Sequence, residues 1–163
     1  MAIRIVSLVA RLGLAAVWLI SGGLKFLDPV QTKIAVRAYQ LLPESLVGPV
    51  ATALPLVEIV LGLLILVGLA VRVSAAVSVV ILTVLIAVII SVWARGLSID
   101  CGCFGGGGGA ADIGAWDYLK EILRDLGFLA LAVWLLVFPR SPLALGPGSR
   151  AAFSVDTQSS VAR

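Results

Sequence analysis

The chain holds two cysteines, Cys101 and Cys103, with one glycine between them and a run of five glycines shortly after. It has no histidine, which excludes imidazole-bound haem, histidine-bearing zinc sites and the commonest general base. Two cysteines supply half of a tetrahedral metal site, so we expect no metal centre within one chain. The chemistry that these residues favour is therefore thiol chemistry.

Four interpretations of the cysteine pair stay open: small buried hydrophobes, a metal site shared across a dimer, a structural disulfide, or a redox-active dithiol. A structural bridge would close so small a ring that it constrains little chain entropy. Gly102 permits a turn that brings alternate residues within disulfide distance, and a strained bridge exchanges readily. Asp100 should disfavour the thiolate of Cys101, whereas Arg95 could favour it. We favour the redox-active dithiol.

The composition places this pair in a membrane protein. Hydrophobic residues make up 61% of the 163 residues and charged residues only 13%, with a mean hydropathy of +1.15. Continuous apolar runs long enough to cross a bilayer indicate helices and argue against a barrel. We predict an all-α bundle of four transmembrane helices, over residues 5–26, 50–71, 73–94 and 119–138. Arg72 is expected to mark a tight turn between the second and third helices.

Basic residues predict the orientation of the bundle. The side that holds both termini carries one acid, Asp156, against five arginines: Arg4, Arg72, Arg140, Arg150 and Arg163. This excess predicts a multi-pass protein of the plasma membrane with both termini in the cytoplasm. The loops over residues 27–49 and 95–118 would then lie outside, where disulfide chemistry is permitted.

The segments between the helices have different expected roles. Residues 28–42 predict a short amphipathic helix on the membrane surface, stopped by Pro43. The run Gly105–Gly109 predicts a flexible loop that needs support to hold a shape. We expect one membrane domain over residues 1–138 and a disordered cytoplasmic tail over 139–163. We expect membrane lipid to surround the helices, and we expect no nucleic-acid partner.

Charged residues inside the predicted helices form a second candidate site. Such residues are costly in hydrocarbon and usually pair or face a cavity. Lys25, Glu58, Arg124 and Asp125 are predicted to gather beneath the cysteine loop, whereas Arg11 lies at another depth. The favoured interpretation is an ionic latch, and the alternative is a pocket that binds a quinone or relays protons. Glycines such as Gly22 and Gly62 are expected to allow close helix packing, and tryptophans such as Trp18 to anchor helix ends at the interface.

Three further patterns carry a family resemblance: Gly13, Trp18, Ser21-Gly22 and Lys25; then Tyr39-Gln40-Leu41-Leu42-Pro43; then Pro55, Glu58 and Gly62. Together they resemble DoxX-like membrane proteins. Arg95-Gly96 followed by Asp100-Cys101-Gly102-Cys103-Phe104-Gly105 narrows the resemblance, over residues 5–138, to the MauE-type branch.

The resemblance implies a four-helix membrane protein that takes part in disulfide maturation for methylamine utilisation. Relatives often accompany thioredoxin-like or DsbA-like partners. By position, Cys101 and Cys103 would be the redox pair, supported by Lys25, Glu58 and Arg95. The five-glycine run and the tail rich in Ser, Pro and Gly are peculiar to this chain and give no reason to expect that it acts in methylamine metabolism.

Two functional hypotheses follow. The first is a thiol–disulfide oxidoreductase or redox partner for an extracytoplasmic thioredoxin-fold protein, with a membrane quinone as the only suggested cofactor. A stand-alone quinone-reducing enzyme normally has a second cysteine pair, so a partner-dependent role is favoured. The alternative is a non-catalytic accessory or assembly subunit of a larger membrane complex, with structural cysteines. A transporter is disfavoured because the helices show no paired repeats.

Overall fold

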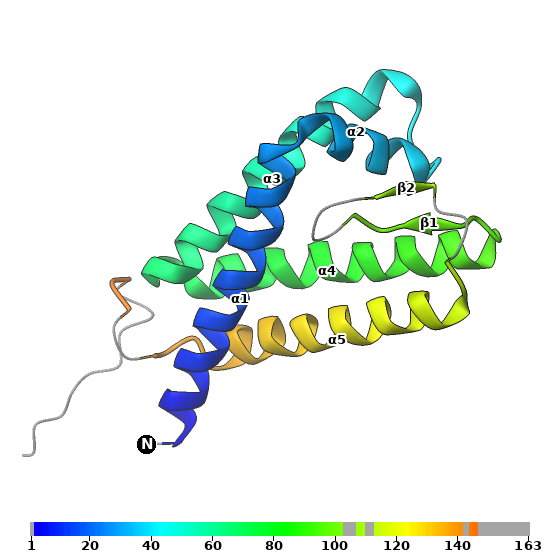
Figure 1. The fold of residues 1–163 in the computed structure, drawn as a ribbon. Helices are drawn as coiled ribbons and strands as arrows, with labels where there is room; N and C mark the ends of the chain where they lie inside the picture. Colours follow the sequence, from blue (N-terminus) through cyan, green and yellow to red (C-terminus); the bar gives the residue numbers. More distant parts are fainter. Residues whose placement is uncertain (1, 103–106, 110–112, 142–143, 147–163) are drawn as a thin grey trace, which may run out of the picture.

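The structure is a computed structural model that describes residues 2–102, 107–109, 113–141 and 144–146. Most described residues are helical, as predicted (Figure 1). The helices are α1 (Ala2–Leu27), α2 (Pro29–Ala38), α3 (Glu44–Val67), α4 (Val71–Ala94) and α5 (Ala115–Val137). Sequence reasoning did not foresee two short antiparallel strands, β1 (Ile99–Asp100) and β2 (Gly108–Gly109).

Three helices of the described chain are long and apolar enough to cross a membrane: residues 3–27 of α1, all of α3 and all of α4. Helix α5 has 23 residues, but its first half carries five charged side chains: Asp117, Lys120, Glu121, Arg124 and Asp125. The three apolar helices confirm a membrane protein. That α5 forms a fourth span stays a prediction.

The long helices pack as two pairs, α1 with α3 and α4 with α5, and α1 also contacts α5 (Figure 1). Two glycines set the spacing of the first pair. A Cβ atom on Gly22 would lie 2.9 Å from the Cβ of Glu58, and one on Gly62 would lie 2.7 Å from Leu19. Because both distances are shorter than side-chain atoms tolerate, these glycines allow α1 and α3 to approach closely.

Two predicted boundaries are corrected. The turn between α3 and α4 lies at Gly68 and Ala70, which have φ of 77° and 48°, and Arg72 is already inside α4. Helix α2 ends at Ala38, because Gln40 has a positive φ of 52°, and Pro43 is instead the N-cap residue directly before α3. A proline without an N–H suits the start of a helix, where that N–H would have no partner.

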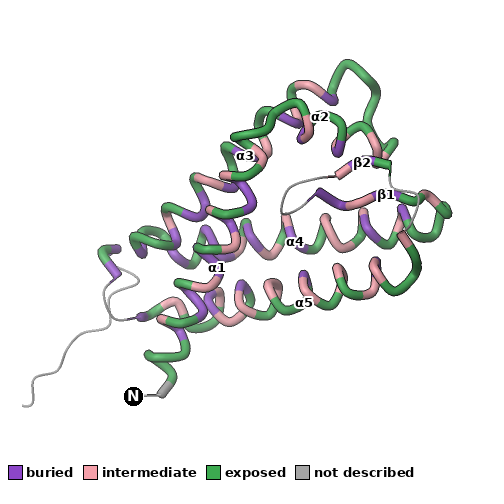
Figure 2. The backbone as a smooth tube through the Cα atoms, viewed as in Figure 1, coloured by how far each residue is buried: buried purple, intermediate pink, exposed green. Residues whose placement is uncertain are grey.

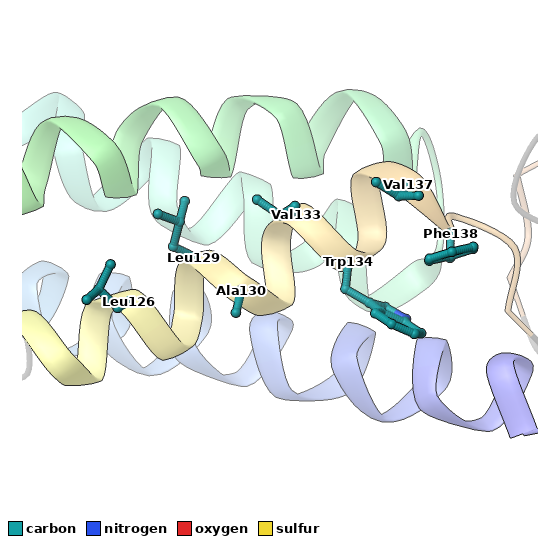
Figure 3. Close-up of a pocket in the computed structure, with 7 residues that line it drawn as sticks. All are labelled: Leu126, Leu129, Ala130, Val133, Trp134, Val137 and Phe138. Carbon is teal, nitrogen blue, oxygen red and sulfur yellow. The ribbon is translucent and has the colours of Figure 1, made fainter.

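The buried residues follow the inner faces of the helices, and the outward faces are exposed and apolar (Figure 2). On α5, apolar side chains from Leu126 to Phe138 line an open groove of about 420 Å³ (Figure 3). Trp18 does not anchor an interface. It is 3% exposed, and its indole N–H donates to Ser78 Oγ at 2.9 Å, which places it in the core.

The two ends of the molecule differ in structure. The N-terminus, the α3–α4 turn and the end of α5 lie at one end, and α2 with the strands lies at the other (Figure 1). At the first end, Ser141, Ala144 and Gly146 pack against α1 and the turn: Arg11 Nη1 donates to Ser141 Oγ, and the Gly146 N–H donates to Gly68 O. Disorder was predicted over residues 139–163; of these, residues 142–143 and 147–163 lie outside the described residues.

Candidate functional site

The segment that carries Cys101 is held by a small ribbon and by α2. Ile99 and Asp100 pair with Gly109 and Gly108. Gln31 on α2 donates its side-chain N–H to Gly107 O at 2.5 Å. Gly107 has φ of 102°, and a Cβ there would lie 2.6 Å from the Cβ of Ala35 on α2. Part of the glycine run therefore has a defined position, because glycine alone fits this backbone against the helix.

Two tyrosines fix the backbone on either side of this ribbon. Tyr118 of α5 donates its hydroxyl hydrogen to Leu97 O at 2.5 Å and accepts the Ile99 N–H at 3.1 Å. Tyr39, just after α2, donates to Cys101 O at 2.8 Å. Arg95 donates to Tyr39 O at 2.7 Å. Arg95 thus supports the cysteine segment through Tyr39.

The sulfur of Cys101 lies between charged groups of α5. Cys101 is 8% exposed. Arg124 Nη2 lies 3.7 Å from its Sγ, and the Glu121 carboxylate shares a hydrogen bond with the thiol. A neighbouring guanidinium favours a thiolate over a thiol, and a carboxylate can accept the thiol proton. The neighbour Asp100 is turned to the backbone, where its Oδ1 accepts the Gly102 N–H at 3.0 Å.

Asp100, Cys101 and Glu121 also form a group of possible metal ligands, since their ligand atoms all lie within 4.8 Å of one another. The guanidinium of Arg124 opposes a cation at this position, because it already supplies a positive charge beside the sulfur. Carboxylates with a single thiolate also lack the nitrogen and sulfur set of a structural zinc site. The donor set fits proton and thiol chemistry better than metal binding.

A buried ion pair joins α1 to α3 below this segment. Lys25 Nζ lies 2.5 Å from Glu58 Oε1, and the two side chains are only 11% and 5% exposed. Ser21 links the pair, because its hydroxyl donates to Glu58 Oε2 at 3.0 Å and accepts from Lys25 at 2.8 Å. The close approach at Gly22 brings Glu58 within reach of this side of α1.

A cavity of about 80 Å³ lies between the Lys25–Glu58 pair and Cys101. Trp18, Lys25, Thr32, Glu58 and Cys101 are among its lining residues. Asp125, which is 1% exposed and bonded to Arg124 at 2.9 Å, lines a neighbouring hollow with Lys25 and Glu58. Three of the four charged residues expected beneath the cysteine loop therefore line one hollow, and Arg124 is joined to that group through Asp125.

Several residues of the site had no predicted role. Glu121 contacts the sulfur, Tyr39 bonds to the cysteine backbone, and Thr32 lines the cavity. Helical spacing could have indicated Glu121, because it stands four residues before Asp125 and hence on the same face. Cys103 lies outside the described residues, so its position relative to Cys101 is not described.

Comparisons with known proteins complete the description. No curated protein and no solved structure matched the chain. The family model described as methylamine utilisation protein MauE matches residues 3–138. That range covers all five helices, except the first residue of α1, and every candidate site residue named above. The chain belongs to the MauE family of membrane proteins.

Proposed function

We propose that this chain is a membrane-embedded thiol–disulfide exchange protein, in which Cys101 and Cys103 pass electrons to or from an extracytoplasmic thioredoxin-fold partner. The observation that carries the proposal is the setting of the Cys101 sulfur. A guanidinium at 3.7 Å and a hydrogen-bonded carboxylate are suited to forming a thiolate and accepting its proton.

The exchange balances without another reactant. A thiolate of the pair attacks a disulfide sulfur of the partner, forms a mixed disulfide and releases one partner thiolate. The second cysteine then attacks the mixed disulfide, so that this chain gains a Cys101–Cys103 bridge and the partner becomes a dithiol. Two electrons and two protons move to the partner, and the reverse reaction moves them back.

The buried carboxylates suit this movement of protons. Glu121 Oε2 and Asp125 Oδ2 are buried and have no hydrogen-bond partner within the described residues. A buried carboxylate oxygen without a donor is costly when ionised, so such a group readily takes up a proton. Both stand on α5 beside Arg124, one turn apart.

We propose the orientation with both termini in the cytoplasm, α5 as the fourth span of a plasma-membrane protein and the cysteine segment outside. The distribution of basic residues supports it, because Arg4 and Arg72 lie on the elements that form the end opposite the cysteine segment. A membrane-impermeant maleimide added to intact cells should then label a cysteine placed at Gly96. In the Cys101→Ser/Cys103→Ser background, which both probes require, a cysteine placed at Leu69 should be labelled only after lysis. The reverse pattern contradicts the orientation.

Mixed-disulfide trapping tests the exchange. The full chain in nanodiscs, as Cys101→Ser or Cys103→Ser, is mixed with an oxidised DsbA-type thioredoxin-fold protein as the probe. We expect at least one single variant to accumulate a mixed disulfide that reductant reverses. The Cys101→Ser/Cys103→Ser double variant is the control and should form none. If neither variant traps the probe, and alkylation of the unmodified chain is the same in reducing and oxidising buffer, the exchange function is lost.

The alternative function is a non-catalytic accessory subunit of a larger membrane complex. The open apolar groove on α5 favours it, because a neighbouring membrane helix could fill such a surface (Figure 3). In that case the double-serine variant should support assembly of the complex as well as the unmodified chain does.

A further inference from the structure

A second hollow opens at the corner between α1 and α2, beside the cavity described above. Its volume is about 260 Å³, and its lining includes Leu24, Leu27 and Gln31. It shares Lys25, Thr32 and Gly102 with the cavity that reaches Cys101. The two spaces therefore adjoin, and Cys101 lines the inner one.

The mouth of this outer hollow stands at the end of a span and carries two exposed leucines beside the exposed Asp28. Leu24 is 39% exposed and Leu27 is 80% exposed, and both belong to the last turn of the apolar stretch of α1. Leucines exposed at this position face the lipid near the membrane surface. A molecule dissolved in the lipid can thus enter here without passing through water.

The polar groups inside favour a neutral ligand with a hydrogen-bond acceptor. Glu58 already balances the charge of Lys25, and Asp28 adds a negative charge at the mouth, so the site has little attraction for an anion. An ammonium has three N–H donors, and within the described part of the chain two of those on Lys25 have acceptors, Ser21 and Glu58. The third can donate to a carbonyl of a bound molecule.

The volumes indicate where a ring would lie. An apolar cavity of about 150 Å³ accommodates benzene. The outer hollow is larger than this, and the inner cavity is smaller. A six-membered ring therefore fits the outer hollow with one edge toward Lys25 and the cysteine segment.

We propose that the hollow at the α1–α2 corner binds the ring of a lipid-soluble quinone, which oxidises the Cys101–Cys103 dithiol. This inference rests on the proposed exchange function. In the reaction the two thiols become one disulfide, and their two protons and two electrons convert the quinone to the quinol. Lys25 would hold a quinone carbonyl and act as a binding residue.

Binding is tested without chemistry in the Cys101→Ser/Cys103→Ser variant, with decylubiquinone as the probe and the full chain in nanodiscs. Trp18 lines the inner cavity, so a bound quinone should quench its fluorescence saturably. The quench should be lost in Trp18→Phe and kept in Trp134→Phe, the matched control on the distant part of α5. Quenching that does not saturate, or that is equal in the two variants, overturns the site.

The role of Lys25 is tested in the same assay. The variant Lys25→Met/Glu58→Met removes the donor without leaving a buried charge, and we expect quinone affinity to fall about fivefold or more. Arg11→Met at the other end of α1 should leave the affinity unchanged. Equal affinity in both variants contradicts the proposed contact.

Coupling is tested with the reduced unmodified chain under anaerobic conditions. Two thiols should disappear for each decylubiquinone reduced. If thiols remain while the quinone binds, or if no quinone binds, the inference fails. The proposed function survives either failure provided that the trapping experiment still yields a mixed disulfide, so the two hypotheses are separable.

Discussion

Helix α1 buries two basic residues, Arg11 toward one end of the molecule and Lys25 toward the other, and the two have different partners. Arg11 is 2% exposed, donates to the neutral hydroxyl of Ser141 at 3.0 Å and packs beside Gly68 and Ala144. Lys25 instead contacts the carboxylate of Glu58 in the wall of a cavity that reaches Cys101. The contacts of Arg11 join the residues after α5 to the helix bundle. Those of Lys25 place an ion pair next to a thiol.

This difference shows how one helix can serve both structure and chemistry. At the Arg11 end the guanidinium is surrounded by backbone and small side chains, an arrangement suited to packing. At the Lys25 end, the carboxylate of Glu58 balances the ammonium of Lys25, and the adjoining hollow remains open for a ligand. We infer that substitutions at the Lys25 end affect stability and thiol reactivity together, and that those at the Arg11 end affect stability alone.

The largest expected effect is that of Glu58→Gln. It leaves the ammonium of Lys25 buried without its counter-charge, and breaking a buried pair in this way costs about 3 kcal/mol or more. We expect a clear loss of stability in reversible unfolding from mild detergent. The Lys25→Met/Glu58→Met variant should recover most of the loss, because it leaves no unpaired charge.

Glu44→Gln is the matched control, since it makes the same change in an exposed pair on the same helix. Glu44 pairs with Arg37, and their side chains are 65% and 52% exposed. Exposed pairs add little stability, so this variant should unfold much as the unmodified chain does. If the two glutamine variants lose the same stability, the buried pair contributes no more than the exposed pair. The proposed difference between the two ends would then be wrong.

A smaller effect is expected for Arg11→Met. It removes hydrogen bonds from a charged donor but leaves a neutral serine, so the loss should be about 2 kcal/mol. The same unfolding assay measures it. Alkylation of Cys101 should be unchanged, and a change in that rate would contradict the separation of the two ends.

The long helices could be predicted from hydropathy, because apolar runs of span length leave few alternatives to a helix. The gathering of Lys25 and Glu58 was also predictable, since buried charges must find partners. Both arguments use a property of the residues themselves and need no knowledge of the connecting segments.

The short segments depended on contacts that sequence does not reveal. Pro43 was expected to end a helix, yet it is the N-cap residue of α3, because proline is compatible with either boundary of a helix. Gly107–Gly109 have a defined position because Gly107 contacts Gln31 and Ala35 on α2. These residues lie more than seventy positions away in the sequence. Arg95 was the predicted cation for the sulfur, but Arg95 donates to Tyr39 O, and the packing of α5 places Arg124 beside the sulfur instead.

A moderate effect on reactivity, and a smaller one on stability, is expected for Arg124→Gln. In a Cys103→Ser background, loss of the guanidinium beside the sulfur should slow alkylation of Cys101 at neutral pH by about threefold or more. The pH profile of the rate should move to higher pH. Lys120→Gln is the control on the same helix, because Lys120 pairs with Asp117 at the surface. Equal profiles for the two variants would show that Arg124 does not influence the thiol.

The smallest effect concerns the first turn of α5, which positions Arg124 and Glu121. Asp117 accepts the Gly114 N–H at 3.1 Å, and this bond with that from Lys120 holds the pKa of the carboxyl below its usual range. A lowered pKa in the folded state means that the stabilisation is present above the unfolded pKa of about 4 and is lost as pH falls through the folded pKa. We expect Asp117→Asn to melt about one degree below the unmodified chain at neutral pH. The difference should vanish in acid below the folded pKa. A difference that stays constant with pH would show that the charge of Asp117 contributes nothing, and that the Lys25 end of the molecule depends on its buried groups alone.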